Sequence, residues 1–255
     1  MTSRPAVLVT GGAKRIGAAI ARRFGEAGWH VVLHYGASQD EADALAGDLP
    51  SAETIGCDLG DTPAAAAMIA GLAERLDDWR LLINSASVFA IDAVTGLDPA
   101  TNARVMEINA RAPALMAQQF LALAKAKGGR RVIQVTDQKI ANPNPDFFSY
   151  TMSKHALAST VAMLSKARRD PRDRVYGLAP GAILPSHDQS EAETDISHRL
   201  NLLRRKTGAD EVANAALFLA NGWLASGQTL FVDSGQHLLD QPRDVIYLAR
   251  EGAPA

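Results

Sequence analysis

The chain has 255 residues, of which 47% are hydrophobic, and its 26 basic residues nearly balance its 28 acidic ones. This composition is sufficient for one folded domain covering residues 1–255, and it gives no general attraction for nucleic acid or a membrane surface. A single cysteine excludes an internal disulfide, and without a signal-like or membrane-spanning apolar run we expect a cytoplasmic protein.

Short apolar runs alternate with amphipathic or alanine-rich segments along the chain. We expect buried strands at residues 6–10, 30–33, 52–57, 81–84, 131–136, 175–179 and 229–232. We expect helices at residues 16–27, 41–48, 63–75, 112–127, 153–168 and 209–219. This alternation is typical of an α/β fold with a doubly wound parallel sheet and helices on both faces.

Two segments carry neither pattern and are predicted to be loops. Residues 141–148 contain Pro143 and Pro145, and residues 182–194 are polar and interrupted by Pro185. Ligands in doubly wound sheets bind beyond the carboxyl ends of the strands. Both loops follow strands, so we expect them to lie over a site, the second as a mobile lid.

A glycine-rich turn follows the first predicted strand, with the sequence Thr10-Gly11-Gly12-Ala13-Lys14-Arg15-Ile16-Gly17. Glycines permit a tight turn and close approach to a pyrophosphate, which the free N–H groups of the next helix stabilise. A plain turn can use glycine for steric reasons alone, but the position between strand and helix favours a dinucleotide site. The predicted cofactor contacts here are Gly11, Lys14, Arg15, Ile16 and Gly17.

The end of the second strand favours NADP(H) over NAD(H). NAD-dependent enzymes usually place Asp or Glu there for the ribose 2′-OH, whereas this chain has His34-Tyr35-Gly36-Ala37-Ser38. A 2′-phosphate would meet no repulsion, and Lys14, Arg15, His34 and Ser38 can donate to it. We count His34, Tyr35 and Ser38 as cofactor contacts. The alternative is that they are solvated polar residues, because no Arg follows this strand.

Other strand ends supply further predicted cofactor contacts. Asp58, followed by Leu59, can accept from the adenine amino group or can instead cap the next turn. The remaining contacts lie after the fourth and sixth strands, at Asn84, Ser85, Ala86, Pro180 and Gly181.

The sharpest signal for chemistry is Tyr150-Thr151-Met152-Ser153-Lys154. One helical turn separates the phenol from the ammonium, so both can face one cleft and contact the cofactor, with Lys154 on the nicotinamide ribose. We expect the cation to lower the pKa of Tyr150 toward working pH and make it a general acid. Taken alone, the spacing also fits an exposed tyrosine packed on a lysine stem.

Together with Asn109, with Asn84-Ser85-Ala86-Ser87 and with Pro180-Gly181, these motifs resemble the short-chain dehydrogenase/reductase family over the whole chain. The resemblance implies a Rossmann-like sheet of about seven strands and a homodimer or homotetramer. It also implies that Tyr150, Lys154 and Asn109 are catalytic, with Asn109 holding a water in the proton path.

Two positions depart from the common family pattern. Arg15 replaces a loop glycine, and Asp137 stands thirteen residues before Tyr150, where the family commonly has serine. Both changes resemble the pteridine reductase branch, which includes bacterial dihydromonapterin and dihydrofolate reductases. Aspartate would repel a developing alkoxide, whereas protonation of a ring nitrogen can use Asp137 with Tyr150. The alternative for Asp137 is a local turn cap.

The same resemblance implies a slot for a flat substrate. Ser87 would line it and Phe89 would stack on a pterin, while Arg15, Asp137 and Tyr150 complete the substrate contacts. Phe89 as an ordinary core residue is the alternative. Ser85 departs from the asparagine of many relatives.

The predicted function is therefore NADPH-dependent reduction of a C=N bond in a pterin or dihydrofolate-like small molecule. The alternatives are a carbonyl or alcohol oxidoreductase of the same fold and a catalytically silent NADP-binding sensor. No metal is predicted, because His155, His187, His198 and His237 have no ligand spacing. The tail at residues 237–255 can cross a subunit interface.

Overall fold

Within residues 4–186 and 188–251, which the computed structural model describes, seven parallel strands form one sheet in the order β3-β2-β1-β4-β5-β6-β7. His187 and tail residues 252–255 lie outside the described residues. The strands are β1 (Ala6–Val9), β2 (His30–Tyr35), β3 (Ala52–Gly56), β4 (Trp79–Asn84), β5 (Arg131–Val135), β6 (Arg174–Pro180) and β7 (Thr229–Val232). The chain reverses its direction of sheet growth between β1 and β4, which confirms the doubly wound prediction.

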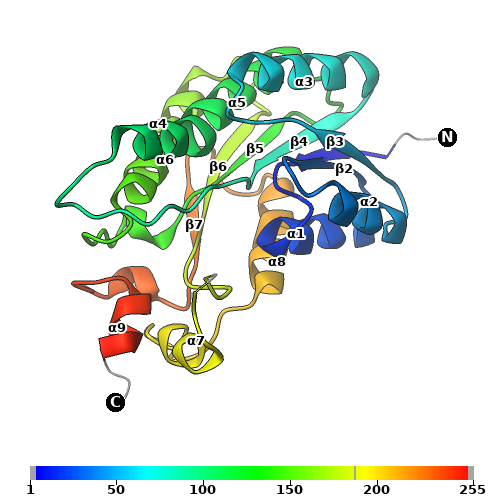
Figure 1. Cartoon of the computed structure of the whole chain (residues 1–255). Coiled ribbons are helices and arrows are strands. Elements are labelled where there is room, and N and C mark those ends of the chain that lie inside the picture. The colour runs from blue at the N-terminus through cyan, green and yellow to red at the C-terminus, as the bar shows by residue number, and fades with distance from the viewer. Residues whose placement is uncertain (1–3, 187, 252–255) are drawn as a thin grey trace.

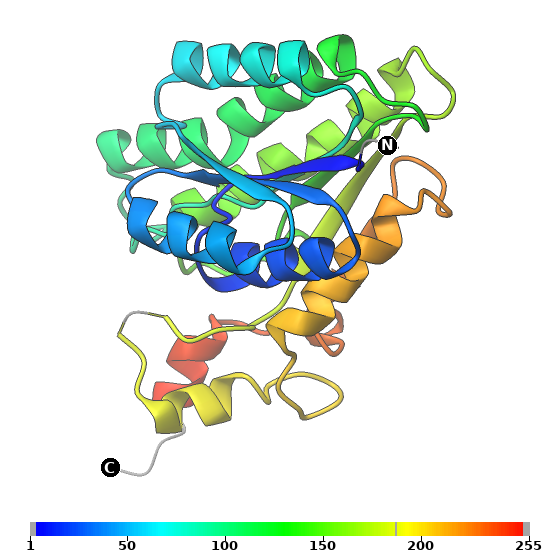
Figure 2. The same ribbon diagram turned by 90° about the vertical axis from the view of Figure 1, so that its right-hand side faces the viewer.

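Helices cover both faces of this sheet (Figures 1 and 2). Side chains alternate along a strand, so Leu8 of β1 faces one layer while Val7 and Val9 face the other. The Leu8 side packs against α3 (Thr62–Arg75), α5 (Ala112–Leu123) and α6 (Phe148–Ala167). The opposite side packs against α1 (Arg15–Glu26), α2 (Gln39–Asp48) and α8 (Ala209–Ala220).

The predicted strands and helices are confirmed, with shifted ends. The helix that carries the Tyr150 motif begins at Phe148 instead of residue 153, so that both Tyr150 and Lys154 lie inside it. Asn109, expected in a helical stretch after the fourth strand, lies in the π-helix η1 (Glu107–Arg111). Several short elements were not predicted: α4 (Pro99–Met106), the 3-10 helices η2 (Gln138–Ile140) and η3 (Gln236–Leu238), α7 (Glu191–Ser197) and α9 (Val245–Glu251). They are too short to show a clear apolar stripe.

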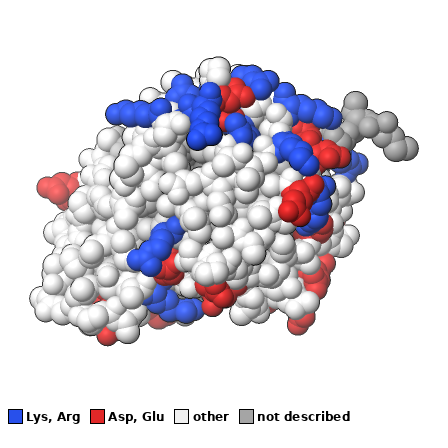
Figure 3. All heavy atoms as spheres, turned by 90° about the horizontal axis from the view of Figure 1, so that it is seen from above, with Lys and Arg blue, Asp and Glu red and all other residues white. Residues whose placement is uncertain are grey.

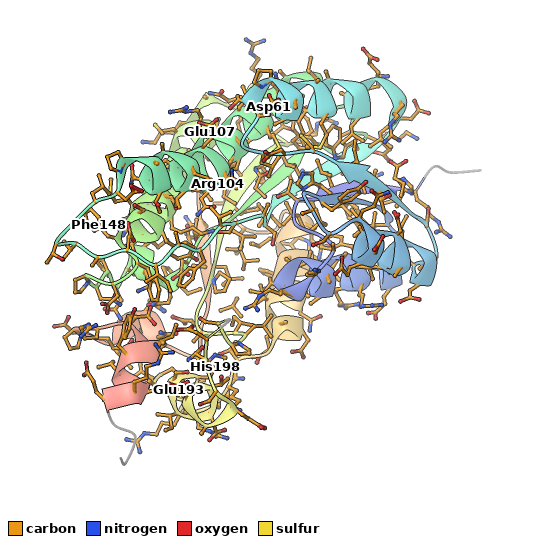
Figure 4. All side chains as sticks on the ribbon, viewed as in Figure 1. Asp61, Arg104, Glu107, Phe148, Glu193 and His198 are labelled. Carbon is orange, nitrogen blue, oxygen red and sulfur yellow. The ribbon has the colours of Figure 1, made fainter. Side chains whose placement is uncertain are left out.

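The second predicted loop, residues 182–194, ends inside the helix α7, which packs against α9. Ser190 and Glu193 form a capping box at the start of α7, which explains why such a polar segment is helical. Glu193 also pairs with Arg250 of α9 at 2.8 Å, and Figure 4 shows Glu193 and His198 beside the α9 ribbon. The helices α7 and α9 thus lie side by side at one end of the molecule (Figure 1). Among the described residues, no helix is long and apolar enough to cross a membrane.

Candidate active site

A cavity of about 420 Å³ opens at the carboxyl ends of β1, β4, β5 and β6. It collects many of the residues predicted from the sequence, namely Gly11, Lys14, Arg15, Ile16, Gly17, Ser85, Ala86, Ser87, Phe89, Asp137, Tyr150, Lys154, Pro180 and Gly181. Other predicted residues do not line the cavity, namely His34, Tyr35, Ser38, Asp58, Leu59, Asn84 and Asn109.

The glycine loop packs too closely for any larger residue at two positions. Gly11 has a φ of +62°, and a Cβ there would lie 2.9 Å from Ala86 Cα. A Cβ on Gly17 would lie 2.1 Å from the carbonyl oxygen of Gly11. Thr10 Oγ1 accepts from the backbone N–H groups of Ser85 and Ala86, each at 3.0 Å. The loop therefore joins the ends of β1 and β4 at one side of the cavity.

Arg15 connects the glycine loop to the loop after β6. Its φ of +53° lies in the left-handed region, which costs a non-glycine residue about 1 kcal/mol and is where the common family pattern has glycine. Its guanidinium donates to the carbonyl oxygen of Pro185 at 2.9 Å. Lys14, in contrast, pairs with Glu41 at 2.6 Å on the surface. Arg15 thus links the glycine loop to the loop after β6 at the cavity.

His34 is hydrogen-bonded to the glycine loop. Its buried ring accepts from the N–H of Gly11 at Nδ1 (3.2 Å), and Nε2 lies 2.9 Å from the carbonyl oxygen of Cys57, to which it donates. Burial lowers the pKa of His34, which favours this neutral tautomer. A direct contact from His34 to a phosphate would require one of these two bonds to break.

Two further predicted cofactor residues have structural partners. Asp58 Oδ1 accepts from the N–H of Gly60 at 2.8 Å, so the turn-capping role is present. Asn84 is buried, and its Nδ2 donates to Gln134 Oε1 at 2.8 Å and to the carbonyl oxygen of Pro113 at 3.1 Å. Asn84 therefore links β4 to β5 and to α5 behind the cavity.

Asp137 and Tyr150 form a hydrogen-bonded pair at the cavity. The phenol of Tyr150 donates to Asp137 Oδ2 at 2.7 Å. The other carboxyl oxygen, Oδ1, accepts from the N–H of Lys139 at 2.9 Å and caps η2. The turn-capping role of Asp137 is thus present, and the same side chain also contacts Tyr150.

The charges around Tyr150 differ from the sequence-based expectation. Burial and the neighbouring Asp137 carboxylate raise the pKa of Tyr150 well above its usual value. The predicted lowering by Lys154 is wrong, because the ammonium lies 5.5 Å from the ring centroid while a carboxylate contacts the hydroxyl. Burial also raises the pKa of Asp137. The phenol therefore keeps its proton at neutral pH and is a donor.

Lys154 is buried, and its Nζ donates to the carbonyl oxygen of Val135 at 2.9 Å. Burial lowers its pKa from 10.5 to about 8. Between these two pH values the unfolded chain binds more protons than the folded chain, so the contribution of Lys154 to stability rises with pH. The charged buried ammonium destabilises the fold by about 3 kcal/mol below that window, and the cost disappears above it.

We therefore expect Lys154→Met to remove a rise of about 3 kcal/mol in the free energy of unfolding between pH 8 and 10.5. Urea titrations of the wild type and the variant at a series of pH values measure this difference. Lys166→Met, which changes an exposed lysine of the same helix, is the matched control and should keep the rise. Parallel stability curves for the wild type and Lys154→Met would contradict the expectation.

Asn109 holds the segment after β4 against α6. Its Oδ1 accepts from the N–H of Val88 and its Nδ2 donates to the carbonyl oxygen of Val88, both at 2.8 Å. The same Nδ2 donates to Ser153 Oγ at 3.1 Å. The side chain thereby fixes the segment that presents Ser87 and Phe89 to the cavity. Its predicted role in catalysis remains a prediction.

Phe89 is an exposed ring in the cavity wall. It is 42% exposed, so the alternative of an ordinary core residue is wrong. Its centroid lies 4.7 Å from that of Tyr150, edge to face, and 4.3 Å from that of Phe147. This aromatic group gives the cavity an apolar surface beside the hydroxyl of Tyr150, which suits a flat ring.

Sequence reasoning missed part of the cavity lining. The missed residues come from η2, from the segment between β6 and the end of α7, from η3 and from the tail. They include Gln138, Lys139, Gln189, His198, Gln236, Asp244, Val245 and Ile246. Asp244 stands directly before an apolar segment, and this pattern in the sequence predicts the start of a helix. In the structure its Oδ1 accepts from the N–H of Ile246 at 3.0 Å, as expected of a capping residue. Nothing local in the sequence places that helix beside Tyr150.

A family model described as enoyl-(acyl carrier protein) reductase matches residues 11–237. The chain belongs to the short-chain dehydrogenase/reductase family. This is a family of oxidoreductases, and the match spans the glycine loop, the Tyr150 motif and the last strand. Among the described residues, no group of three or more His, Cys, Asp or Glu side chains is placed to hold a metal ion.

Several individual members of the short-chain dehydrogenase/reductase family are similar over nearly the whole chain. Pteridine reductase 1 of Leishmania tarentolae is 26% identical over 92% of this chain and 96% of that protein. The crystal structure of FolM alternative dihydrofolate reductase 1 from Brucella canis, complexed with NADP, is 32% identical, covers 94% of this chain and 96% of its own, and has a TM-score of 0.87. The angucycline C-6 ketoreductase LanV, with bound NADP, is 29% identical with a TM-score of 0.83, covering 92% and 96%.

Proposed function

We propose that this protein is a cytoplasmic NADPH-dependent reductase that transfers hydride to a C=N bond of a pterin or dihydrofolate-like substrate. The observation that carries the proposal is the 2.7 Å hydrogen bond between Asp137 and Tyr150 at the cavity. The similarity to a pteridine reductase and to a dihydrofolate reductase supports the same substrate class. An aspartate at this position suits protonation of a nitrogen better than stabilisation of an alkoxide.

The glycine loop suits the cofactor of this proposal. Gly11 and Gly17 leave backbone N–H groups at the start of α1 accessible to a pyrophosphate. Lys14 and Arg15 line the same cavity, and the three residues directly after β2, Gly36-Ala37-Ser38, carry no carboxylate, while Glu41 lies further on and pairs with Lys14. These features favour the 2′-phosphate of NADP(H), and NADP is bound in the similar FolM and LanV structures. NADPH, when bound, supplies the hydride.

We expect Gly17→Ala to abolish measurable NADPH binding, because the added Cβ would lie 2.1 Å from the Gly11 carbonyl oxygen and displace the loop. Quenching of protein fluorescence during NADPH titration measures the affinity. Gly71→Ala, in α3 with nothing near an added Cβ, is the control. Wild-type affinity of the Gly17 variant would show that the cofactor lies elsewhere.

The chain's own residues supply the proton. Tyr150 gives its phenol proton to the substrate nitrogen as the neighbouring ring carbon receives hydride, so that C=N becomes CH–NH. Asp137 in its protonated form returns a proton to the phenolate across their hydrogen bond, and burial raises the pKa of Asp137 in support of that form. Lys154 stabilises the transient phenolate with its positive charge.

We infer that the protein is a homo-oligomer that uses the outer face of α5 and α6. Ala112–Leu123 contains no charged residue, and in residues 148–165 only Lys154 is charged, and it is buried. Leu123, Met152 and Met163 are exposed on these helices. Figure 3 shows a broad area without charged side chains on this side of the molecule. Met163→Glu should shift the mass measured by light scattering toward the monomer.

Oxidation of NADPH with a panel of substrates tests the proposed reaction. The panel contains dihydropterins and dihydrofolate beside aldehydes, ketones and quinones, and NADH replaces NADPH in a parallel series. We expect selective turnover of the pterin or folate compounds with NADPH. Turnover of carbonyl compounds alone would contradict the substrate, and NADPH binding without any turnover would favour a sensor.

A further inference from the structure

The C-terminal segment of the chain enters the cavity next to the Asp137–Tyr150 pair. Asp244, just before α9, pairs through Oδ2 with Lys139 Nζ at 2.7 Å. The two side chains are only 10% and 4% exposed, so the ion pair is buried. Both residues line the cavity, and neither has a role in the proposed reaction. A buried ion pair is costly in desolvation and only weak evidence for stability, so its position beside the site calls for a role.

Lys139 acts on Asp137 at close range. Its backbone N–H donates to Asp137 Oδ1 at 2.9 Å, and its Nζ also donates to Asn144 Oδ1 at 2.8 Å. Its carbonyl oxygen accepts from His155 Nε2 at 3.1 Å. Three bonds and one ion pair therefore hold this residue, and with it the turn that presents the Asp137 carboxyl group to Tyr150.

Asp244 acts on Tyr150, the other member of the Asp137–Tyr150 pair. Its Oδ1 accepts from the N–H of Ile246 at 3.0 Å and begins the turn that directs Ile246 toward the cavity. Ile246 packs in one buried cluster with Phe147 and Tyr150. One carboxylate thus binds both the turn that carries Asp137 and the apolar wall behind Tyr150.

The tail also holds the loop that joins these two residues. The backbone N–H of Asp244 donates to Asp146 Oδ2 at 2.8 Å, and Arg243 Nε donates to the same oxygen at 2.9 Å. The ring of Tyr247 stacks on that of Phe147 with centroids 5.8 Å apart. Phe147 has a φ of +54°, a left-handed conformation that needs such support in a non-glycine residue.

We propose that Asp244 and Lys139 are positioning residues of the reductase, which hold Asp137 and Tyr150 in contact and set the charge around their shared proton. This role rests on the proposed function, in which that proton reaches the substrate. It makes the chain's own tail a part of its active site.

The Asp244–Lys139 ion pair is well placed to control the charge of Asp137. The titratable or charged groups that act directly on Asp137 are Lys139, Tyr150 and Lys154. Lys14, Arg15, His198 and Asp244 line the same cavity, and His155 contacts the carbonyl oxygen of Lys139. Lys139 is the cation nearest in sequence, and its charge lowers the pKa of Asp137 in opposition to burial. Asp244 partly compensates that cation, and its own charge raises the pKa of Tyr150.

Two opposite substitutions separate this role from simple packing. Asp244→Asn leaves the Lys139 cation uncompensated, so we expect the pKa of Asp137 to fall by about one unit or more. Lys139→Met removes the cation and should raise that pKa by a similar amount, while its backbone N–H still caps Asp137. The double variant restores a neutral contact and should return the pKa toward the wild-type value.

The measurement is a carbon-13 NMR titration of the aspartate carboxyl groups, with the Asp137 signal assigned from Asp137→Asn. Arg250→Gln is the matched control, since it breaks ion pairs between α9 and the lid without touching η2, and it should leave the Asp137 titration unchanged. Shifts in the same direction for both single variants, or equal pKa values in all variants, would overturn the proposal.

Kinetics provide the second reading. With the preferred dihydropterin, the fall of kcat at high pH should move to lower pH in Asp244→Asn and to higher pH in Lys139→Met, with unchanged NADPH affinity in both. A loss of kcat without movement of this limb would assign the pair to packing alone. If the wild type reduces no pterin, the proposed function fails, and the NMR titration still decides the role of the pair.

Discussion

Tyr150→Phe is expected to lower kcat by about 10²–10⁴-fold and to leave the affinity for NADPH unchanged. The substitution removes only the hydroxyl, which is the proton donor next to Asp137 Oδ2. The raised pKa of Tyr150 means that the wild-type phenol is protonated throughout the neutral range. Steady-state rates with a dihydropterin give kcat, and fluorescence titration gives the NADPH affinity.

The matched control for this variant is Tyr176→Phe. Tyr176 lies on β6 away from the cavity, and its hydroxyl donates to the carbonyl oxygen of Leu224 at 2.6 Å. Its loss should cost about 1 kcal/mol of stability without changing kcat. Full activity of Tyr150→Phe beside an intact Asp137 would remove the phenol from the reaction and leave Asp137 as the direct acid.

Asp137→Ser is expected to lower the rate of pterin reduction by about 10²-fold or more while preserving or increasing any carbonyl reduction. Serine is the common family residue at this position, and its hydroxyl suits an alkoxide. The wild-type rate should fall as pH rises through the raised pKa of Asp137, because the protonated carboxyl group is the active form. In the serine variant the rate should no longer fall with rising pH in this range.

Asp137→Asn separates proton transfer from the structural role of the side chain. The amide oxygen can still accept from the N–H of Lys139 and cap η2, but the amide cannot carry the proton. We expect the asparagine variant to fold with wild-type stability and to be as inactive on pterins as the serine variant. Wild-type turnover with asparagine would show that Asp137 acts only as a cap.

The sequence alone predicted the framework because its signals are local. Buried strands appear as short apolar runs, and a glycine turn between a strand and a helix predicts the cofactor end whatever the rest of the chain does. The spacing from Tyr150 to Lys154 puts both on one helix face, and the spacing from Asp137 to Tyr150 carried the resemblance to pteridine reductases. The structure confirms this sheet and brings these side chains to one cavity.

Charge environments were not readable from the sequence. The pKa of Tyr150 was predicted to fall because Lys154 is one helical turn away. In the folded chain the hydroxyl instead contacts a carboxylate, and both groups are buried. His34 similarly has both ring nitrogens bonded to backbone groups, each 23 residues away in the sequence. Burial and the partner at each atom are properties of packing, not of spacing.

The tail illustrates the same limit most clearly. Asp244 and Lys139 are separated by more than one hundred residues, and nothing in the sequence indicates that their side chains meet. The sequence by itself determined the order of strands and helices, the glycine loop and the Tyr150–Lys154 spacing, because periodicity and local geometry fix them. Only the tertiary structure decided which distant side chains meet, because a buried ion pair forms only after the tail packs against η2.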